Sequence, residues 1–254
     1  MLQNRGLPRE FTVVIPALNE EQVIGDLLRR IDTALAGRSF DIIVVDDGSD
    51  DGTAAQVLAG PSHWRVIQHD VRGGQSAAIH TGVVAARSEL IVTLDADGQN
   101  PPEEIPKLLA AWSENKGKVE LGLVAGQRVK RQDRRAKLWA SRAANFIRGA
   151  ALKDGTRDTG CGLKVFPRKV FLSLPYFDHM HRFLPALVVR SGLVVVHVDV
   201  AHAARQGGVS KYTNLQRALV GVVDLVGVMW LIRRKKTTHA RELQKAPVKL
   251  SNIQ

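Results

Sequence analysis

The chain has 254 residues, 44% of them hydrophobic, and a net charge of +11 at pH 7, which is typical of a globular protein with anionic partners. Only 5% of the residues are aromatic and no base-stacking module is visible, so no nucleic-acid partner is expected. The single cysteine, Cys161, excludes an internal disulfide framework, and no segment reaches the roughly 18–20 apolar residues of a membrane-spanning helix.

Apolar segments alternate with helix signals along the first half of the chain. Strands are expected at 11–15, 42–45, 64–68, 90–94 and 119–125, and helices after Asn19, after Asp51-Gly52-Thr53, at 76–86 and at about 103–115. Pro16 is expected to end the first strand, and Asn19 to cap the first helix. This alternation predicts an α/β fold with a parallel, doubly wound sheet, whose ligand binds beyond the carboxyl ends of the strands. No G-x-G-x-x-G pattern and no P-loop is present, which disfavours a dinucleotide cofactor and an ordinary NTPase.

The fourth apolar segment stops abruptly at Asp95-Ala96-Asp97. Residues i and i+2 of a strand point to the same side, so the two carboxylates are expected to converge on one point. Such a pair is costly to bury without a positive charge between them, and Mg²⁺ or Mn²⁺ would supply that charge. Gln99 continues the alternation and could add a neutral oxygen ligand. Taken alone, the Asp-x-Asp pattern would favour a simple polar turn between a strand and a helix, and the rest of the chain reverses that preference.

Four motifs occur in a fixed order: PALNE at 16–20, VDDGSDDGT at 45–53, LDADGQNPPE at 94–103 and RQGGVSK at 205–211. Together they resemble the family-2 glycosyltransferases, in particular the dolichol-phosphate mannosyltransferase group and its bacterial polyprenyl-phosphate relatives. The resemblance covers roughly residues 10–232. It implies an A-type glycosyltransferase fold, with a Rossmann-like, mostly parallel sheet flanked by helices.

The resemblance also implies a set of site residues. The nucleotide-sugar would be bound by Pro16, Glu20, Asp47, Arg72, Asp95, Gln99, Arg205 and Lys211, and the metal by Asp95, Asp97 and Gln99. Catalytic roles are expected for Asp97, Arg128 and Asp158. Arg205 and Lys211 match a loop that closes over the diphosphate, although a pair of basic residues is often simply a solvated loop.

A dense basic cluster follows the fifth expected strand. Arg128, Arg131 and Arg135 in this cluster could hold an anionic acceptor such as a lipid phosphate, or they could form a basic surface that faces solvent or anionic lipid. Asp158 starts the loop Asp158-Thr159-Gly160-Cys161-Gly162, which lies near the acceptor side in relatives; a turn-forming role is an equal alternative. Some relatives have an acid at the position of Cys161, which weakens any assignment of a catalytic base. His179 and His181 are expected to be structural rather than metal ligands.

The segment 213–236 is expected to form a C-terminal amphipathic helix, either interfacial on a membrane or packed in the core, after a catalytic domain at 1–212 and before a basic, disordered tail at 237–254. Peripheral attachment to an anionic membrane at its cytoplasmic face, with a possible membrane-protein partner, is expected. The expected activity is inverting transfer of a sugar from a nucleoside-diphosphate sugar to polyprenyl phosphate, for a cell-envelope glycan or lipid modification. Alternatives are transfer to a sugar or protein hydroxyl, and a non-catalytic module that binds nucleotide-sugar or lipid phosphate.

Overall fold

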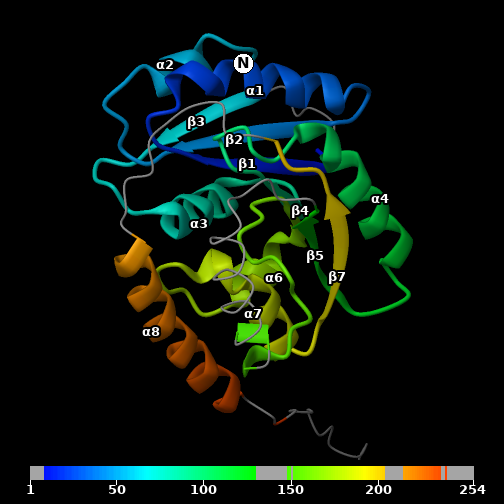
Figure 1. Cartoon of the computed structure of the whole chain (residues 1–254). Coiled ribbons are helices and arrows are strands. Elements are labelled where there is room, and N and C mark those ends of the chain that lie inside the picture. Colours follow the sequence, from blue (N-terminus) through cyan, green and yellow to red (C-terminus); the bar gives the residue numbers. More distant parts are fainter. Residues whose placement is uncertain (1–8, 130–147, 150, 204–213, 236–237, 239–254) are drawn as a thin grey trace, which may run out of the picture.

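The computed structural model describes residues 9–129, 148–149, 151–203, 214–235 and 238. Its centre is a seven-stranded sheet with the order β3-β2-β1-β4-β6-β5-β7 (Figure 1). The strands are β1 (Phe11–Ala17), β2 (Phe40–Asp46), β3 (Trp64–Gln68), β4 (Leu90–Thr93), β5 (Leu121–Arg128), β6 (Lys164–Pro167) and β7 (Val194–Val200). Only β6 runs antiparallel to its neighbours β4 and β5, so the sheet is mostly parallel and matches the predicted fold.

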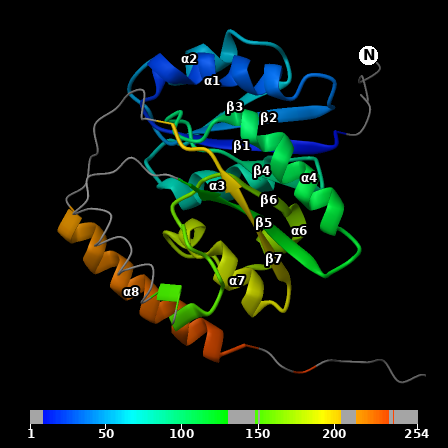
Figure 2. The ribbon, with the colours of Figure 1, turned by 45° about the vertical axis from the view of Figure 1, so that its right-hand side comes forward.

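Helices cover both faces of the sheet (Figures 1 and 2). One face carries α1 (Glu21–Ala34), α2 (Thr53–Leu58), the short η1 (Pro102–Glu104) and α4 (Ile105–Asn115). The other carries α3 (Gln75–Ala85), α6 (Arg168–Ser173), η2 (Met180–Arg182) and α7 (Leu184–Arg190), with α8 (Asn214–Arg233) along their outer side. Alternate residues of each central strand enter the two cores, as Val13 and Val14 of β1 do, which is why these strands are apolar throughout.

Two local predictions about the first strand and helix are wrong. Pro16 does not end β1, because the strand continues to Ala17 and Pro16 pairs with Val45. Asn19 does not cap α1; it has a left-handed backbone (φ 56°) and its side-chain amide donates to Asp50. The helix starts at Glu21. The backbone amides of Glu20 and Glu21 donate instead to the side chains of Thr53 and Asp51, at and before the start of α2.

The expected C-terminal helix is present as α8, and it packs on one side only. Val228 is fully buried against the core, and Leu225 and Met229 are packed beside it, whereas Val223 and Trp230 on other sides of the helix are exposed. Both sides are therefore apolar over 220–232, and the amphipathic character stays a prediction. Within the described part of the chain, no helix combines the length and the apolar character needed to cross a bilayer.

Candidate active site

The carboxyl ends of the six mutually parallel strands lie at one edge of the sheet, and most described site residues are there. Pro16 is the second-last residue of β1, Asp47 directly follows β2, and Asp95 and Asp97 follow β4. Arg128 is the last residue of β5. The sheet topology thus brings together residues that are up to 112 positions apart, Pro16 and Arg128.

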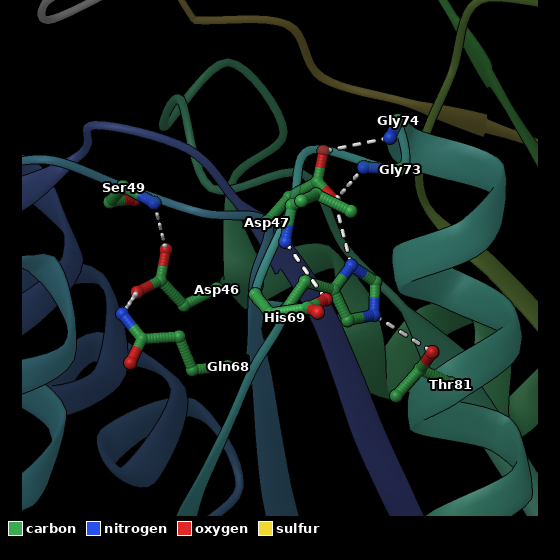
Figure 3. A network of polar contacts seen from close by, with 10 residues as sticks. Asp46, Asp47, Ser49, Gln68, His69, Gly73, Gly74 and Thr81 are labelled. Carbon is green, nitrogen blue, oxygen red and sulfur yellow. Dashed lines mark hydrogen bonds and ion pairs between the residues drawn. The ribbon is translucent and has the colours of Figure 1, made fainter.

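Asp47 organises the loop between β3 and α3 (Figure 3). Its carboxylate accepts hydrogen bonds from the backbone amides of Gly73 and Gly74, each at 2.8 Å, and lies 2.8 Å from Nδ1 of His69. Nε2 of His69 lies 2.9 Å from the hydroxyl of Thr81 in α3. These bonds hold the exposed Arg72 at the sheet edge, so Asp47 has a positioning role beside its predicted nucleotide contact.

The preceding acid, Asp46, contacts the loop after β2 and the end of β3. It is fully buried, and its carboxylate accepts the backbone amide of Ser49 at 3.0 Å and the side-chain amide of Gln68 at 2.9 Å (Figure 3). Both carboxylates of the VDDGS motif therefore accept hydrogen bonds from backbone amides and also contact side chains at the end of β3. Glu20, whose amide donates to Thr53 at 2.9 Å, sits at the start of α1 next to this loop.

Asp95 and Asp97 lie in a turn after β4, which ends at Thr93, so strand alternation is not the reason for their proximity. The carboxylate of Asp95 accepts the side-chain amides of Gln75 at 2.7 Å and Asn100 at 3.2 Å. Burial raises the pKa of Asp95 to about 6, and the negative charge of Asp97 adds to the rise, against the smaller opposing effect of nearby cations. The predicted electrostatic conflict between the two acids is therefore present.

Gln99 contributes to this turn through its backbone. Its amide donates to Oδ1 of Asp97 at 3.1 Å, and its carbonyl accepts the amide of Ala203, which follows β7, at 3.0 Å. These bonds fix Asp97 and connect the turn to the strand at the far side of the sheet. A metal contact of the Gln99 side chain stays a prediction.

The loop 158–162 closes over the Asp95 carboxylate from the β6 side. A Cβ atom on Gly162 would lie 2.3 Å from Cγ and both carboxylate oxygens of Asp95, so glycine is required for this approach. The hydroxyl of Thr93 donates to the carbonyl of Gly162 at 2.7 Å and holds the loop against the end of β4. The D-T-G-C-G motif is thus part of the acidic site.

Arg128 and Asp158 form a two-pronged ion pair beside the acidic turn. Nε and Nη2 of Arg128 donate to Oδ2 and Oδ1 of Asp158 at 2.6 and 2.9 Å, and both side chains are about nine-tenths buried. Burial opposes the charge of Arg128, but the hydrogen bonds and the charge of Asp158 raise its pKa above the ordinary value. Asp158 also accepts the amide of Gly160 at 3.1 Å, so its carboxylate positions Arg128 and the loop. A direct catalytic role for Asp158 stays a prediction.

Three residues of the site were not anticipated from the sequence. Asn100 and Lys164 are almost fully buried, and Gln75 reaches Asp95 from the first turn of α3. Lys164 donates to the carbonyl of Cys161, and burial lowers its pKa while the nearby Cys161 and Asp95 partly offset the effect. Lysine in the buried run LKVF is a signal that sequence reasoning could have used, because lysine is rarely fully buried without a partner.

His179 and His181, in the segment 177–185, contact different parts of the structure. Nδ1 of His179 lies 3.2 Å from Asp224 in α8, whereas Nδ1 of His181 lies 2.8 Å from the hydroxyl of Ser76 in α3. Burial lowers the pKa of His181 well below its usual range. Among the described residues, no cluster of three or more histidine, cysteine or acidic side chains could hold a metal by itself. Arg131, Arg135, Arg205 and Lys211 lie outside the described residues.

Cys161 is buried, and burial raises the pKa of its thiol. Its sulfur lies 3.5 Å from the side-chain oxygen of Asn100, the residue that also donates to Asp95. A thiol in this state is a poor nucleophile, and the contact is instead part of the packing beneath the acidic turn.

Relatives of this chain are found among bacterial enzymes. It is 34% identical over 240 residues to dodecaprenyl-phosphate galacturonate synthase of Rhizobium johnstonii, which covers 89% of this chain and 68% of that protein. It is 36% identical over 225 residues to undecaprenyl-phosphate 4-deoxy-4-formamido-L-arabinose transferase of Pseudomonas aeruginosa, covering 86% of this chain and 64% of that protein. The chain thus spans about two thirds of the length of these relatives.

Solved structures confirm the fold. Glucosyl-3-phosphoglycerate synthase from Mycobacterium tuberculosis, crystallised with Mn²⁺, UDP and glucosyl-3-phosphoglycerate, superimposes with a TM-score of 0.68 at 20% identity. The match covers 88% of this chain and 80% of that one. In sequence, residues 12–174 match the family described as Glycosyl transferase family 2. This range includes the carboxyl ends of β1, β2, β4 and β5, where the site residues described above lie. The chain belongs to glycosyl transferase family 2.

Proposed function

We propose that this protein transfers one sugar from a nucleoside-diphosphate sugar to polyprenyl phosphate, with inversion at the anomeric carbon. The observation that carries the proposal is the similarity, at 34–36% identity over more than 85% of the chain, to transferases named for polyprenyl-phosphate products or acceptors. The reaction would take place at the acidic turn after β4 and at Arg128 at the end of β5, which lie at the edge of the sheet where such folds bind ligands.

A divalent cation suits the acidic turn. The two carboxylates repel each other, and the raised pKa of Asp95 measures how much the site disfavours uncompensated negative charge. Asp95 and Asp97 would hold the ion together with the donor diphosphate, as Mg²⁺ and Mn²⁺ are commonly bound through few carboxylates plus substrate phosphates. When bound, such an ion offsets the negative charge that develops on the departing nucleoside diphosphate.

The donor would be oriented by the strand ends on the other half of the edge. Pro16, Glu20 and Asp47 are proposed to contact the nucleoside, and Arg72, in the loop that Asp47 holds, to lie beside it. Gln75 links this half to Asp95 through its 2.7 Å hydrogen bond. A donor bound across both halves would therefore be aligned by a single connected set of contacts.

Arg128 is the described residue best suited to receive the acceptor phosphate. Asp158 fixes its guanidinium with two hydrogen bonds, and the N–H groups that these bonds do not use could donate to a phosphate oxygen. A phosphate monoester is already anionic near neutral pH, so its oxygen can attack the anomeric carbon without a protein base. The new carbon–oxygen bond forms as the bond to the nucleoside diphosphate breaks, and that leaving group takes the electron pair. Arg131 and Arg135 are proposed to assist Arg128 at the acceptor, and Arg205 and Lys211 to act on the diphosphate.

The acceptor is a membrane lipid, so the enzyme is proposed to act peripherally at the cytoplasmic face of the cell membrane. The decisive experiment incubates the protein with a panel of radiolabelled UDP- and GDP-sugars and polyprenyl phosphate, with Mg²⁺, with Mn²⁺ or with chelator. We expect label in the lipid phase with one donor, dependent on metal and lost in Asp95→Asn. Label that never enters lipid with any donor, or full activity of Asp95→Asn, would refute the proposal.

A further inference from the structure

The outer side of α8 carries a row of exposed apolar side chains, here called the outer stripe: Val222, Val223, Val226 and Trp230. Their exposed fractions are 60, 71, 61 and 59%. The spacing 222, 226, 230 places them on one side of the helix, and Val223 lies beside them, three residues before Val226. Contiguous apolar residues of this size are unusual on a free surface and indicate a binding partner.

Contacts on the opposite side of the helix fix its orientation. Val228 is buried in the core, and Nε of Arg190 in α7 donates to the carbonyl of Leu231 at 2.8 Å. Asp224, the only acidic residue in the sequence of α8, lies on this inner side, 3.2 Å from His179. The outer stripe therefore cannot turn inward without breaking these contacts, and it carries no acidic residue. In both views the helix lies at the periphery of the molecule (Figures 1 and 2).

The helix ends in exposed positive charge. Arg233, Arg234 and Lys235 follow directly after the stripe and are all exposed. An apolar helix side with a tryptophan near its end and a basic terminus is typical of helices that lie in the interface of an anionic bilayer. The stripe itself has no acidic side chain to offer these three cations if a second copy packs on it, whereas the headgroups of an anionic bilayer carry negative charge.

We propose that the outer stripe docks the protein on an anionic bilayer, with α8 lying in the plane of the membrane and the basic end contacting lipid headgroups. The inference rests on the proposed function, which requires access to a lipid acceptor. It adds the surface through which the enzyme reaches that lipid.

The docking surface is connected to the acidic site by direct contacts. His179 contacts Asp224 in α8, and two residues later His181 contacts Ser76 in the first turn of α3. The neighbouring Gln75 holds the carboxylate of Asp95. A bilayer bound to α8 is therefore held at a fixed position relative to the site where the lipid phosphate has to react.

The test is sedimentation of the full chain with vesicles of phosphatidylcholine, with and without about one third phosphatidylglycerol, in the absence of any donor. Wild type is expected to bind the anionic vesicles, more weakly as salt increases. Val226→Glu should lower the partition coefficient at least about tenfold, because it places a charge in the apolar interface. The matched control is Leu58→Glu, the same charge change at a 72% exposed leucine of α2 on the opposite side of the sheet, which should bind like wild type.

A second readout uses Trp230 directly. Brominated lipids should quench part of the wild-type fluorescence, and Trp230→Phe should lose that part while it still binds vesicles. Absence of vesicle binding by wild type, wild-type binding by Val226→Glu, or equal loss in Leu58→Glu would overturn the proposal. A dimer in solution that Val226→Glu dissolves, with vesicle binding unchanged, would also overturn it.

Transfer to detergent-solubilised polyprenyl phosphate separates docking from catalysis. Val226→Glu should keep the wild-type rate in detergent and lose most of it when the acceptor is in vesicles. If no donor supports transfer even in detergent while vesicle binding depends on Val226 as expected, the docking surface stands and the proposed activity fails.

Discussion

Substitution of Gly162 by alanine is the most direct test of the acidic site. The added Cβ would lie 2.3 Å from three atoms of the Asp95 carboxylate, in a position where an ordinary contact begins near 3.4 Å. Gly162 itself cannot retreat easily, because its carbonyl accepts the hydroxyl of Thr93 at 2.7 Å. The carboxylate must therefore move by about 1 Å, and it must stretch or break its hydrogen bonds with Gln75 and Asn100.

The expected effect is large on activity and small on stability. A displacement of about 1 Å in a group that positions the reacting atoms costs on the order of 100-fold in rate. Weakening, without breaking, two hydrogen bonds from amides to a carboxylate costs about 1–3 kcal/mol in the free energy of unfolding, and the reduced freedom of the unfolded chain returns about 0.4–1 kcal/mol. Gly162 does not have a positive φ, so no backbone strain is added.

Initial rates of sugar transfer at saturating metal, and urea unfolding of the same preparations, measure the two effects. Gly221→Ala is the matched control, because nothing lies within 4 Å of its added Cβ, and it should keep the wild-type rate in detergent. A Gly162→Ala enzyme that unfolds like wild type and transfers sugar at the wild-type rate would refute the reasoning. It would mean that the position of the Asp95 carboxylate does not matter for catalysis.

Three further predictions concern charge. Because the pKa of Asp95 is raised to about 6, this carboxyl group in the metal-free folded protein binds a proton more tightly than in the unfolded chain, and the stability of wild type relative to Asp95→Asn should fall by up to about 3 kcal/mol as pH rises from 4 to 6. Asp95→Asn should exceed wild type above pH 6 in urea unfolding; equal stability there would contradict it. Arg128→Lys should lose the two-pronged contact with Asp158, lowering the unfolding free energy by about 1–3 kcal/mol and transfer at least about tenfold, whereas wild-type values would argue against the positioning role. The pKa of His181 is lowered, so the stability of wild type relative to His181→Gln should fall by up to about 1.4 kcal/mol per pH unit as pH falls below 6.5; a difference between the two proteins that does not change with pH would exclude this effect of His181.

The first half of the fold could be predicted because its signals are local. Continuous apolar runs mark β1 to β4, and the four-residue β4 is recognisable since its acidic turn follows it directly. By contrast, β6 pairs with β4 through contacts such as Val92 with Val165, more than 70 positions apart. A four-residue strand that begins with lysine has no pattern of its own, so its antiparallel insertion between β4 and β5 depends on tertiary structure.

The acids of the site could be predicted, but not the groups that hold them. Asp95 and Asp97 are recognisable from their spacing and from the motif around them. Gln75 and Asn100, which hydrogen-bond Asp95, and Lys164, whose charge acts on it, come from three different parts of the chain. An amide in a sequence gives no sign of the carboxylate that it will contact. The same limit explains the mistaken cap at Asn19, since the groups that satisfy the start of α1 belong to a loop 30 residues away.

The groups that contact the carboxylates of Asp154 and Asp158 differ from those that contact Asp95. Asp158 and Asp154 are buried, and each is neutralised by an arginine, Arg128 and Arg148 respectively. Asp95 is partly buried, its oxygens accept hydrogen bonds from two neutral amides, and among the described residues no lysine or arginine lies within ion-pair distance of it or of Asp97.

This difference has a functional consequence. Of the described residues, the two cations that act on Asp95 are bound elsewhere, Arg128 to Asp158 and Lys164 to the carbonyl of Cys161. Amide donors orient a carboxylate without cancelling its charge, so the acidic turn keeps its attraction for an external cation, which a salt bridge would remove. A residue placed only for stability would be better served by an arginine partner, as at Asp154. The arrangement around Asp95 therefore supports the proposal that the acidic turn binds a cation.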